Sequence, residues 1–105
     1  MYIYVNMIIY TIKLKKHKRY GTISYYTTIP KEILKKLNIN KHDIIEYEFS
    51  NLTKDVWYPR ISKVIKKTKN YDSLHIPKLL IENSVGSNTE FIIIHINNIF
   101  KNQNL

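Results

Sequence analysis

The sequence predicts a mainly β protein with short helices, an α+β fold, organised as two consecutive units within one compact domain. Three observations support this prediction. The apolar residues, 44% of the chain, are dominated by β-branched and aromatic types that favour strands. Two glycines and three prolines in 105 residues argue against a loop-rich or fibrous protein. The tripeptide Ile-Pro-Lys occurs at residues 29–31 and again at 76–78. Each copy follows a basic cluster and precedes a short helical pattern, which indicates an internal repeat.

The first ten residues, MYIYVNMIIY, are expected to form a strand rather than a targeting segment. A signal peptide carries its positive charge before the apolar core, whereas here Lys13, Lys15 and Lys16 come after it. The stretch is also too short to span a bilayer. The chain has no cysteine, which excludes disulfides and thiolate metal sites. We expect a soluble, cytoplasmic protein.

The first unit is expected to begin with two strands joined by a basic loop. Residues 8–14 have the β-branched composition of a strand, and residues 15–19 are expected to form the loop. Gly21 can turn the chain, and residues 22–29 return as the second strand. Pro30 keeps the preceding residue extended, and its own fixed φ suits the first helical position. The strand can therefore pass into a helix without a long connection.

The helix after Pro30 is predicted to be two turns long. Ile33, Leu34 and Leu37 form its apolar stripe, and Glu32 places a negative charge in the first turn, where the helix dipole favours it. Asn38 stands where this helix must stop, and asparagine tolerates the left-handed cap. Such a short helix is unstable alone and depends on packing against the rest of the fold.

A third strand is expected at residues 43–49, followed by a turn at 51–54. Asp43, Glu46 and Glu48 are interpreted as one polar face of this strand. The second unit begins near Asp55, and its glycine at position 86 is expected to turn the chain after the second helix.

The two units are predicted to cover residues 6–53 and 54–100 approximately, with 101–105 as a short tail. In the alignment, Ile-Pro-Lys overlies Ile-Pro-Lys, and one residue is deleted after the helix. Asp43 then aligns with Thr89, and Tyr47 with Ile93. One unit alone has little core, so the two units are expected to interlock.

From Thr28 to Tyr47 the sequence resembles the AbrB/SpoVT swapped-hairpin family. The resemblance rests on TIPKEI, on the LNI after the short helix, and on DIIEY at residues 43–47. It covers about a fifth of the chain specifically and is weak across the second unit. In that family two units exchange hairpins to make one β-barrel-like dimer that binds DNA. The resemblance therefore implies an intrachain pseudo-dimer, for which further self-association stays open.

The resemblance also implies which residues contact DNA, namely the basic residues of the first hairpin and those near the short helix. The chain departs from the family pattern in its longer first hairpin, where Gly21 precedes Pro30 by nine positions. It also has Asn38 in place of a usual glycine, and Thr89 where the aligned turn has an aspartate. In the second unit, Asn70 or Asp72 is expected to supply the hairpin turn.

The charge of the chain also favours DNA binding, because the formal net charge is +9 and the basic residues are clustered along the sequence. Lysines outnumber arginines fifteen to two. Lysine acts as a point charge, so mainly phosphate contacts are expected, with Arg19 and Arg60 as the base readers. The predicted DNA-binding residues are Lys13, Lys15, Lys16, Lys18, Arg19, Lys31, Arg60, Lys63, Lys66, Lys67 and Lys69.

Aromatic residues near the basic segments allow a second interpretation. Tyr20, Tyr25, Tyr26 and Tyr71 could stack on single-stranded bases, but tyrosines in strands more often pack at the core or its rim, and this is what we expect here. Trp57 is expected in the core near the join between the units.

The sequence gives little support for an enzyme, and no cofactor or metal is expected. The histidines (His17, His42, His75 and His95) lack metal-ligand spacing, and the serines (Ser24, Ser73 and Ser84) lack a nucleophile motif. No glycine loop is present that could cradle a phosphate.

Three functions stay open on the sequence. The favoured one is a transcriptional regulator that binds double-stranded DNA. The second is an antitoxin with a toxin partner, which the short segment after the last strand disfavours. The third is an architectural or RNA-binding protein without sequence specificity, which the excess of lysine over arginine and the tyrosines would suit.

Overall fold

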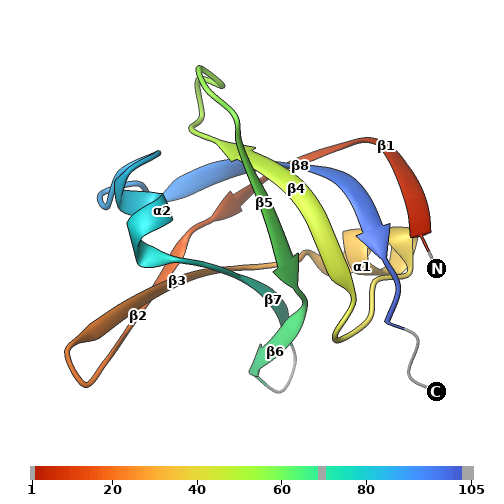
Figure 1. The fold of residues 1–105 in the computed structure, drawn as a ribbon, viewed down its shortest axis with the longest axis horizontal. Coiled ribbons are helices and arrows are strands. Elements are labelled where there is room, and N and C mark those ends of the chain that lie inside the picture. Colours follow the sequence, from red (N-terminus) through yellow and green to blue (C-terminus); the bar gives the residue numbers. More distant parts are fainter. Residues whose placement is uncertain (1, 69–70, 103–105) are drawn as a thin grey trace.

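Two four-stranded antiparallel sheets and two short helices make up the part of the chain described by the computed structural model, residues 2–68 and 71–102 (Figure 1). This confirms the mainly β, α+β fold class. The helices are α1 (Lys31–Leu37) and α2 (Lys78–Glu82). The strands are β1 (Tyr2–Lys13), β2 (Lys15–Arg19), β3 (Thr22–Thr28), β4 (Ile44–Ser50), β5 (Tyr58–Lys63), β6 (Ile65–Thr68), β7 (Tyr71–Ile76) and β8 (Phe91–Phe100).

The strands are shared between the sheets in the order β1-β8-β4-β5 and β2-β3-β7-β6. The elements follow the same series twice along the chain, three strands, a helix and a strand. In the first sheet β1 pairs with β8, and β5 pairs with β4, while β4 and β8 pair in the centre. The first strand of each series therefore pairs with the last strand of the other series.

The pairing register is approximately two-fold symmetric. Thr27 pairs with Leu74, and Glu48 pairs with His95. Both pairs have the same separation along the sequence as Pro30 and Pro77, so each pair maps onto itself when the two halves are exchanged.

This register corrects the sequence alignment after the helices. The Val64 amide donates to the Asp43 carbonyl (2.7 Å), and the Leu14 amide donates to the Glu90 carbonyl (2.8 Å). Asp43 is therefore equivalent to Glu90 rather than to Thr89, and no deletion is needed. Low sequence similarity in the loops after the helices concealed the correct register.

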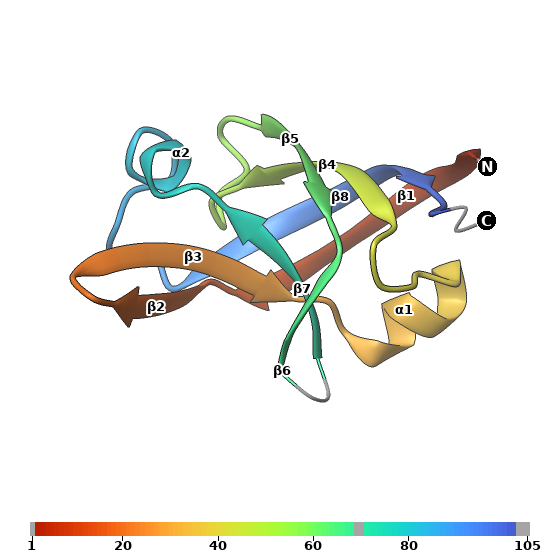
Figure 2. The same ribbon diagram turned by 60° about the horizontal axis from the view of Figure 1, so that its bottom comes forward.

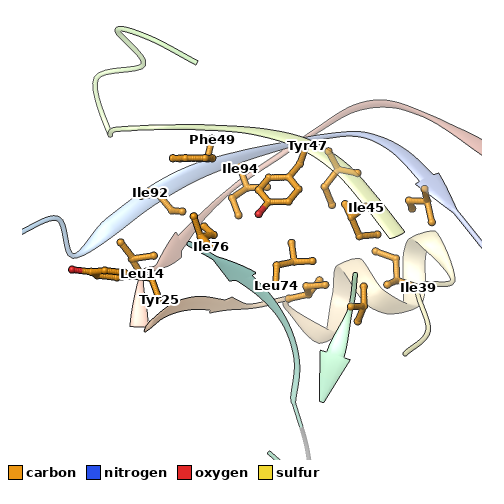
Figure 3. Close-up of a cluster of buried hydrophobic side chains, with 14 of the residues drawn as sticks. Leu14, Tyr25, Ile39, Ile45, Tyr47, Phe49, Leu74, Ile76, Ile92 and Ile94 are labelled. Carbon is orange, nitrogen blue, oxygen red and sulfur yellow. The ribbon is translucent and has the colours of Figure 1, made fainter. Parts of the chain in front are cut away.

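The core lies between the two sheets (Figure 3). Alternate residues of the two central strands point into it, and all of them are buried: Ile45, Tyr47 and Phe49 from β4, and Ile92, Ile94 and Ile96 from β8. The second sheet contributes Tyr25, Leu74 and Ile76. This period-two pattern is what holds the sheets face to face.

The entry into α1 follows the expectation, with a shift of one residue. Pro30 (φ −56°, ψ 140°) is the cap residue, and the helix begins at Lys31. Ile29 stays extended and buried, and its amide donates to the Asp72 carbonyl of the other hairpin (2.8 Å). Asn38 ends the helix in the left-handed conformation (φ 53°, ψ 47°), as predicted.

In the first unit, β2 was not predicted as a strand. Residues 15–19, expected as a loop, form β2, and every residue of β2 pairs with β3, from Lys15 with Tyr26 to Arg19 with Thr22. A run of lysines has low strand propensity, but four of the five pairing partners on β3 are β-branched or aromatic residues that support a ladder. The turn lies beyond this strand, at Tyr20 and Gly21.

Asp43 is also placed differently from the expectation. It precedes β4 and is buried, whereas Glu46 and Glu48 are half-buried and accept hydrogen bonds from the side-chain amides of Asn98 and Asn97. The three acids therefore do not form one polar face, because residue 43 and residues 46 and 48 have opposite parity along the chain.

Candidate nucleic-acid interface

The β2–β3 hairpin projects away from the rest of the molecule (Figures 1 and 2). From Lys16 to Arg19 every residue of β2 is exposed, although successive side chains of a strand point to opposite faces. Both faces of β2 are therefore in water from Lys16 onward, whereas on the paired strand β3 Tyr25 is buried and Ile23 packs against the core. A strand that contributes to a core on one face would show alternating burial instead.

The register places positive charge on both faces of the hairpin. Lys16 and Lys18 pair with Tyr25 and Ile23 and share their face, and the Lys16 ammonium lies 5.5 Å from the centroid of the Tyr25 ring. Arg19 pairs with Thr22 on the opposite face. Lys15 lies on that same face and is half-buried at the base of the hairpin.

The tip of the hairpin is a two-residue turn of unusual composition. Tyr20 and Gly21 both have positive φ, 51° and 77°, as a type I′ turn requires. This turn normally carries Asn-Gly or Asp-Gly, since a bulky side chain is unfavourable at positive φ. The Tyr20 side chain is 93% exposed, and the Arg19 guanidinium lies 5.5 Å from its ring centroid.

Replacement of Tyr20 by asparagine is expected to stabilise the protein by roughly 1 kcal/mol, because asparagine tolerates the left-handed conformation better than tyrosine. The free energy of unfolding in urea measures this change. Tyr20→Ala is the matched control, since it removes the ring without favouring positive φ. An equal gain in both variants would contradict the explanation from the turn.

The sequence expectation for the tyrosines is correct for Tyr25 and wrong for Tyr20. Tyr25 is 2% exposed and belongs to the core, whereas Tyr20 stands fully in solvent. The Tyr-Gly pair between a basic segment and an alternating strand was the available indication of this turn. Trp57, expected in the core, is half-buried and lies edge-on to His95, with 6.2 Å between the ring centroids.

The other predicted DNA-binding residues lie in several places. Lys13 and Lys63 are exposed at the ends of β1 and β5, and they occupy equivalent positions, since they pair with Phe91 and Ile44. Lys31 is the exposed first residue of α1. The remaining lysines, Lys66, Lys67 and Lys69, lie in β6 or directly after it in the sequence. Lys69 lies outside the described residues, and so do the side chains of Lys66 and Lys67.

Arg60 is separate from the basic hairpin. It is half-buried on β5, and its Nε donates to the Ser62 hydroxyl (3.2 Å), which also lies 3.1 Å from the Tyr47 hydroxyl. Burial raises the pKa of Tyr47 to about 12, although the Ser62 hydrogen bond and the Arg60 charge oppose that rise. Arg60 is thus held in a polar network at the edge of the core.

An open hollow of about 450 Å³ adjoins Arg60, between β4, β5, α2 and the end of β8. Its lining includes Glu46, Glu48, Asn97 and the apolar side chains of Ile61 and Leu80. The carboxylates are already hydrogen-bonded to Asn98 and Asn97. Two carboxylates and the guanidinium of Arg60 thus line the hollow, which lacks the uniform positive charge of the hairpin.

Asp43 fixes the start of β4 to the loop after α1 and to the segment that follows β8. It accepts hydrogen bonds from the Asn40 and Asn102 amides (2.8 Å each) and forms an ion pair with Lys101, whose ammonium also donates to the Asn38 carbonyl. Burial alone would raise the pKa of Asp43, but the bonds from Asn102, Lys101 and Asn40 outweigh it and lower the pKa. This network therefore joins α1, β4 and the segment after β8.

Within residues 2–68 and 71–102, no group of three or more histidine, aspartate or glutamate side chains is arranged to hold a metal ion. In that same part of the chain, no helix has the length and apolar character to cross a membrane.

Comparison with known proteins supports the fold. No family model matches the chain, and no curated protein matches it. The solution structure of PHS018 from Pyrococcus horikoshii is similar, with a TM-score of 0.66 and 18% sequence identity. The match covers 91% of this chain and 95% of that chain. At this level of identity the likeness concerns the fold alone.

Proposed function

We propose that this protein binds double-stranded DNA through the β2–β3 hairpin and acts as a transcriptional regulator of AbrB-like type. The observation that carries the proposal is the hairpin itself, a projecting two-stranded ribbon with cations on both faces. The major groove of B-DNA is about 12 Å wide and admits such a ribbon. A ribbon lying in the groove faces a phosphate backbone on each side, so charge on both faces is useful there.

The strand pairing supports the AbrB-like part of the proposal. In a swapped-hairpin dimer, strands of one unit complete the sheet of the other unit. Here β1 pairs with β8, and β5 pairs with β4, across the two halves of the chain. We infer an intrachain pseudo-dimer whose second hairpin, β6–β7, is placed by the same approximate symmetry at the other end of its sheet.

The net charge of +9 and the preponderance of lysine favour phosphate contacts over base readout. Most of the affinity would then come from counterion release. Sequence preference would come from DNA shape and from a small number of base contacts.

Fluorescence anisotropy with random duplex DNA across a salt series tests the proposal. We expect the duplex to bind better than the single strand, and log K to fall with log salt at a slope that corresponds to about four phosphates or more. Preference for the single strand would favour the RNA-binding or architectural alternative. Absence of binding to either form at low salt would contradict a nucleic-acid function.

A further inference from the structure

We propose that Tyr20 is a base-stacking residue, which inserts its ring against a nucleobase while the cations beside it hold the phosphates. The inference rests on the proposed DNA-binding function and assigns a base contact within it. It concerns the tip of the β2–β3 hairpin, which is the part of the ribbon that reaches furthest from the core (Figure 1).

The exposure of the Tyr20 ring favours this contact. Tyrosine in or near a strand normally buries most of its ring against neighbours and keeps only its hydroxyl wet. Tyr25 and Tyr47 go further and bury the whole side chain, since they are 2% and 0% exposed. Tyr20 is 93% exposed, so its ring adds no apolar burial to the fold.

The backbone conformation of Tyr20 favours it as well. A type I′ turn with Gly21 in its second place would be more stable with asparagine before the glycine. Tyrosine at φ 51° is therefore both conformationally unfavourable and unsupported by packing. Residues held in such conformations without structural gain are typical of binding sites.

The cations around the Tyr20 ring also suit a stacked base. Lys18 and Arg19 immediately precede it and are exposed on opposite faces of the ribbon. The Arg19 guanidinium lies 5.5 Å from the ring centroid, which leaves the other side of the ring open in a side chain that is 93% exposed. A base on that open side would complete a stack with cation–π support from the arginine.

The bases of a duplex are already stacked on one another. The Tyr20 ring can therefore stack only at a base step that opens easily. Proteins that bind the minor groove insert apolar wedges that partly unstack one base step and kink the helix, and the Tyr20 ring would unstack a step in a similar way from the major groove. Pyrimidine–purine steps such as TA and CA/TG are the most flexible. We therefore expect the bound sites to be enriched in these steps at the position of Tyr20.

Two variants separate the contribution of the Tyr20 ring to DNA binding from its effect on stability. Tyr20→Asn removes the ring and suits the turn, whereas Tyr20→Phe keeps the ring and removes the hydroxyl. Binding to random duplex DNA at low salt is expected to weaken by roughly 5- to 100-fold in Tyr20→Asn and by less than about twofold in Tyr20→Phe. Thermal unfolding should show Tyr20→Asn to be at least as stable as the wild type, so the loss does not arise from unfolding.

Photo-crosslinking locates the contact. Random duplexes in which 5-bromouracil replaces thymine are irradiated in complex with the wild type, and the crosslinked peptide is sequenced by mass spectrometry. Trypsin cleaves after Arg19 and Lys31 is the next basic residue, so Tyr20 lies at the start of its peptide. We expect the crosslink at Tyr20, and none at this position in Tyr20→Asn.

The outcomes distinguish this inference from the function on which it rests. If the wild type does not bind duplex DNA, the proposed function fails and the inference fails with it. If the wild type binds, either a complex without a crosslink at Tyr20 or equal affinity of Tyr20→Asn and wild type overturns the inference alone.

Discussion

Replacement of Lys16, Lys18 and Arg19 together by glutamine is expected to weaken duplex binding by about a hundredfold or more near 0.1 M salt. These three residues are exposed and lie on both faces of the projecting hairpin. If each neutralises one phosphate, their removal also reduces the slope of log K against log salt by about 2.7. Anisotropy titrations of the variant and the wild type measure both effects.

The matched control is Lys35→Gln, Lys36→Gln and Lys41→Gln, which changes the net charge by the same amount. These lysines are exposed on α1 and in the loop after it, away from the hairpin tip in both ribbon views. A long-range effect of net charge alone would weaken both triple variants equally. Equal losses would therefore contradict a specific role for the hairpin.

The second large effect concerns Asp43. Its replacement by alanine is expected to lower the free energy of unfolding by roughly 3 kcal/mol or more, as for other buried ion pairs that lose one partner. The carboxylate is 1% exposed, and its loss removes the counter-ion of Lys101 and leaves the Asn40 and Asn102 amides without this acceptor. Urea denaturation measures the change. A loss below about 1 kcal/mol would contradict the role of this network.

The same network predicts the direction of a pH dependence. The folded protein lowers the pKa of Asp43, so the unfolded chain takes up the proton at a higher pH than the folded protein does. The contribution of Asp43 to stability is complete above the ordinary aspartate pKa of about 4 and is lost as the pH falls through the lower folded value. Asp43→Asn cannot titrate, so its stability should fall less steeply in that window. Parallel curves for wild type and Asp43→Asn would contradict this assignment.

The sequence was sufficient for the elements that depend on local chemistry. Pro30 and Asn38 mark the two ends of α1 because one fixes φ and the other tolerates the left-handed cap. The alternation of Ile45, Tyr47 and Phe49 defines a strand with one buried face. Both properties are local. The cap at Asn38 and a strand at residues 43–49 were predicted, whereas Pro30 lies one residue before the helix begins.

The sequence was not sufficient for features that depend on distant pairing. Residues 15–19 look like a loop by composition and become a strand through pairing with β3. The register between the halves depends on contacts such as Val64 with Asp43 and Leu14 with Glu90, which no local pattern contains. The basic residues are also separated in space, since the cations of β2 lie on a projecting ribbon while Arg60 lies in a polar network and lines a hollow together with Glu46 and Glu48.

The most direct test of the account is an NMR titration of the ¹⁵N-labelled protein with duplex DNA. We predict that the largest amide shift changes fall on residues 15–22, with little change on sheet residues such as Ile9 and Glu46 that lie away from the hairpin. Changes concentrated around Glu46, Glu48 and Arg60, with residues 15–22 unaffected, would contradict the assignment of the β2–β3 hairpin as the DNA-binding element.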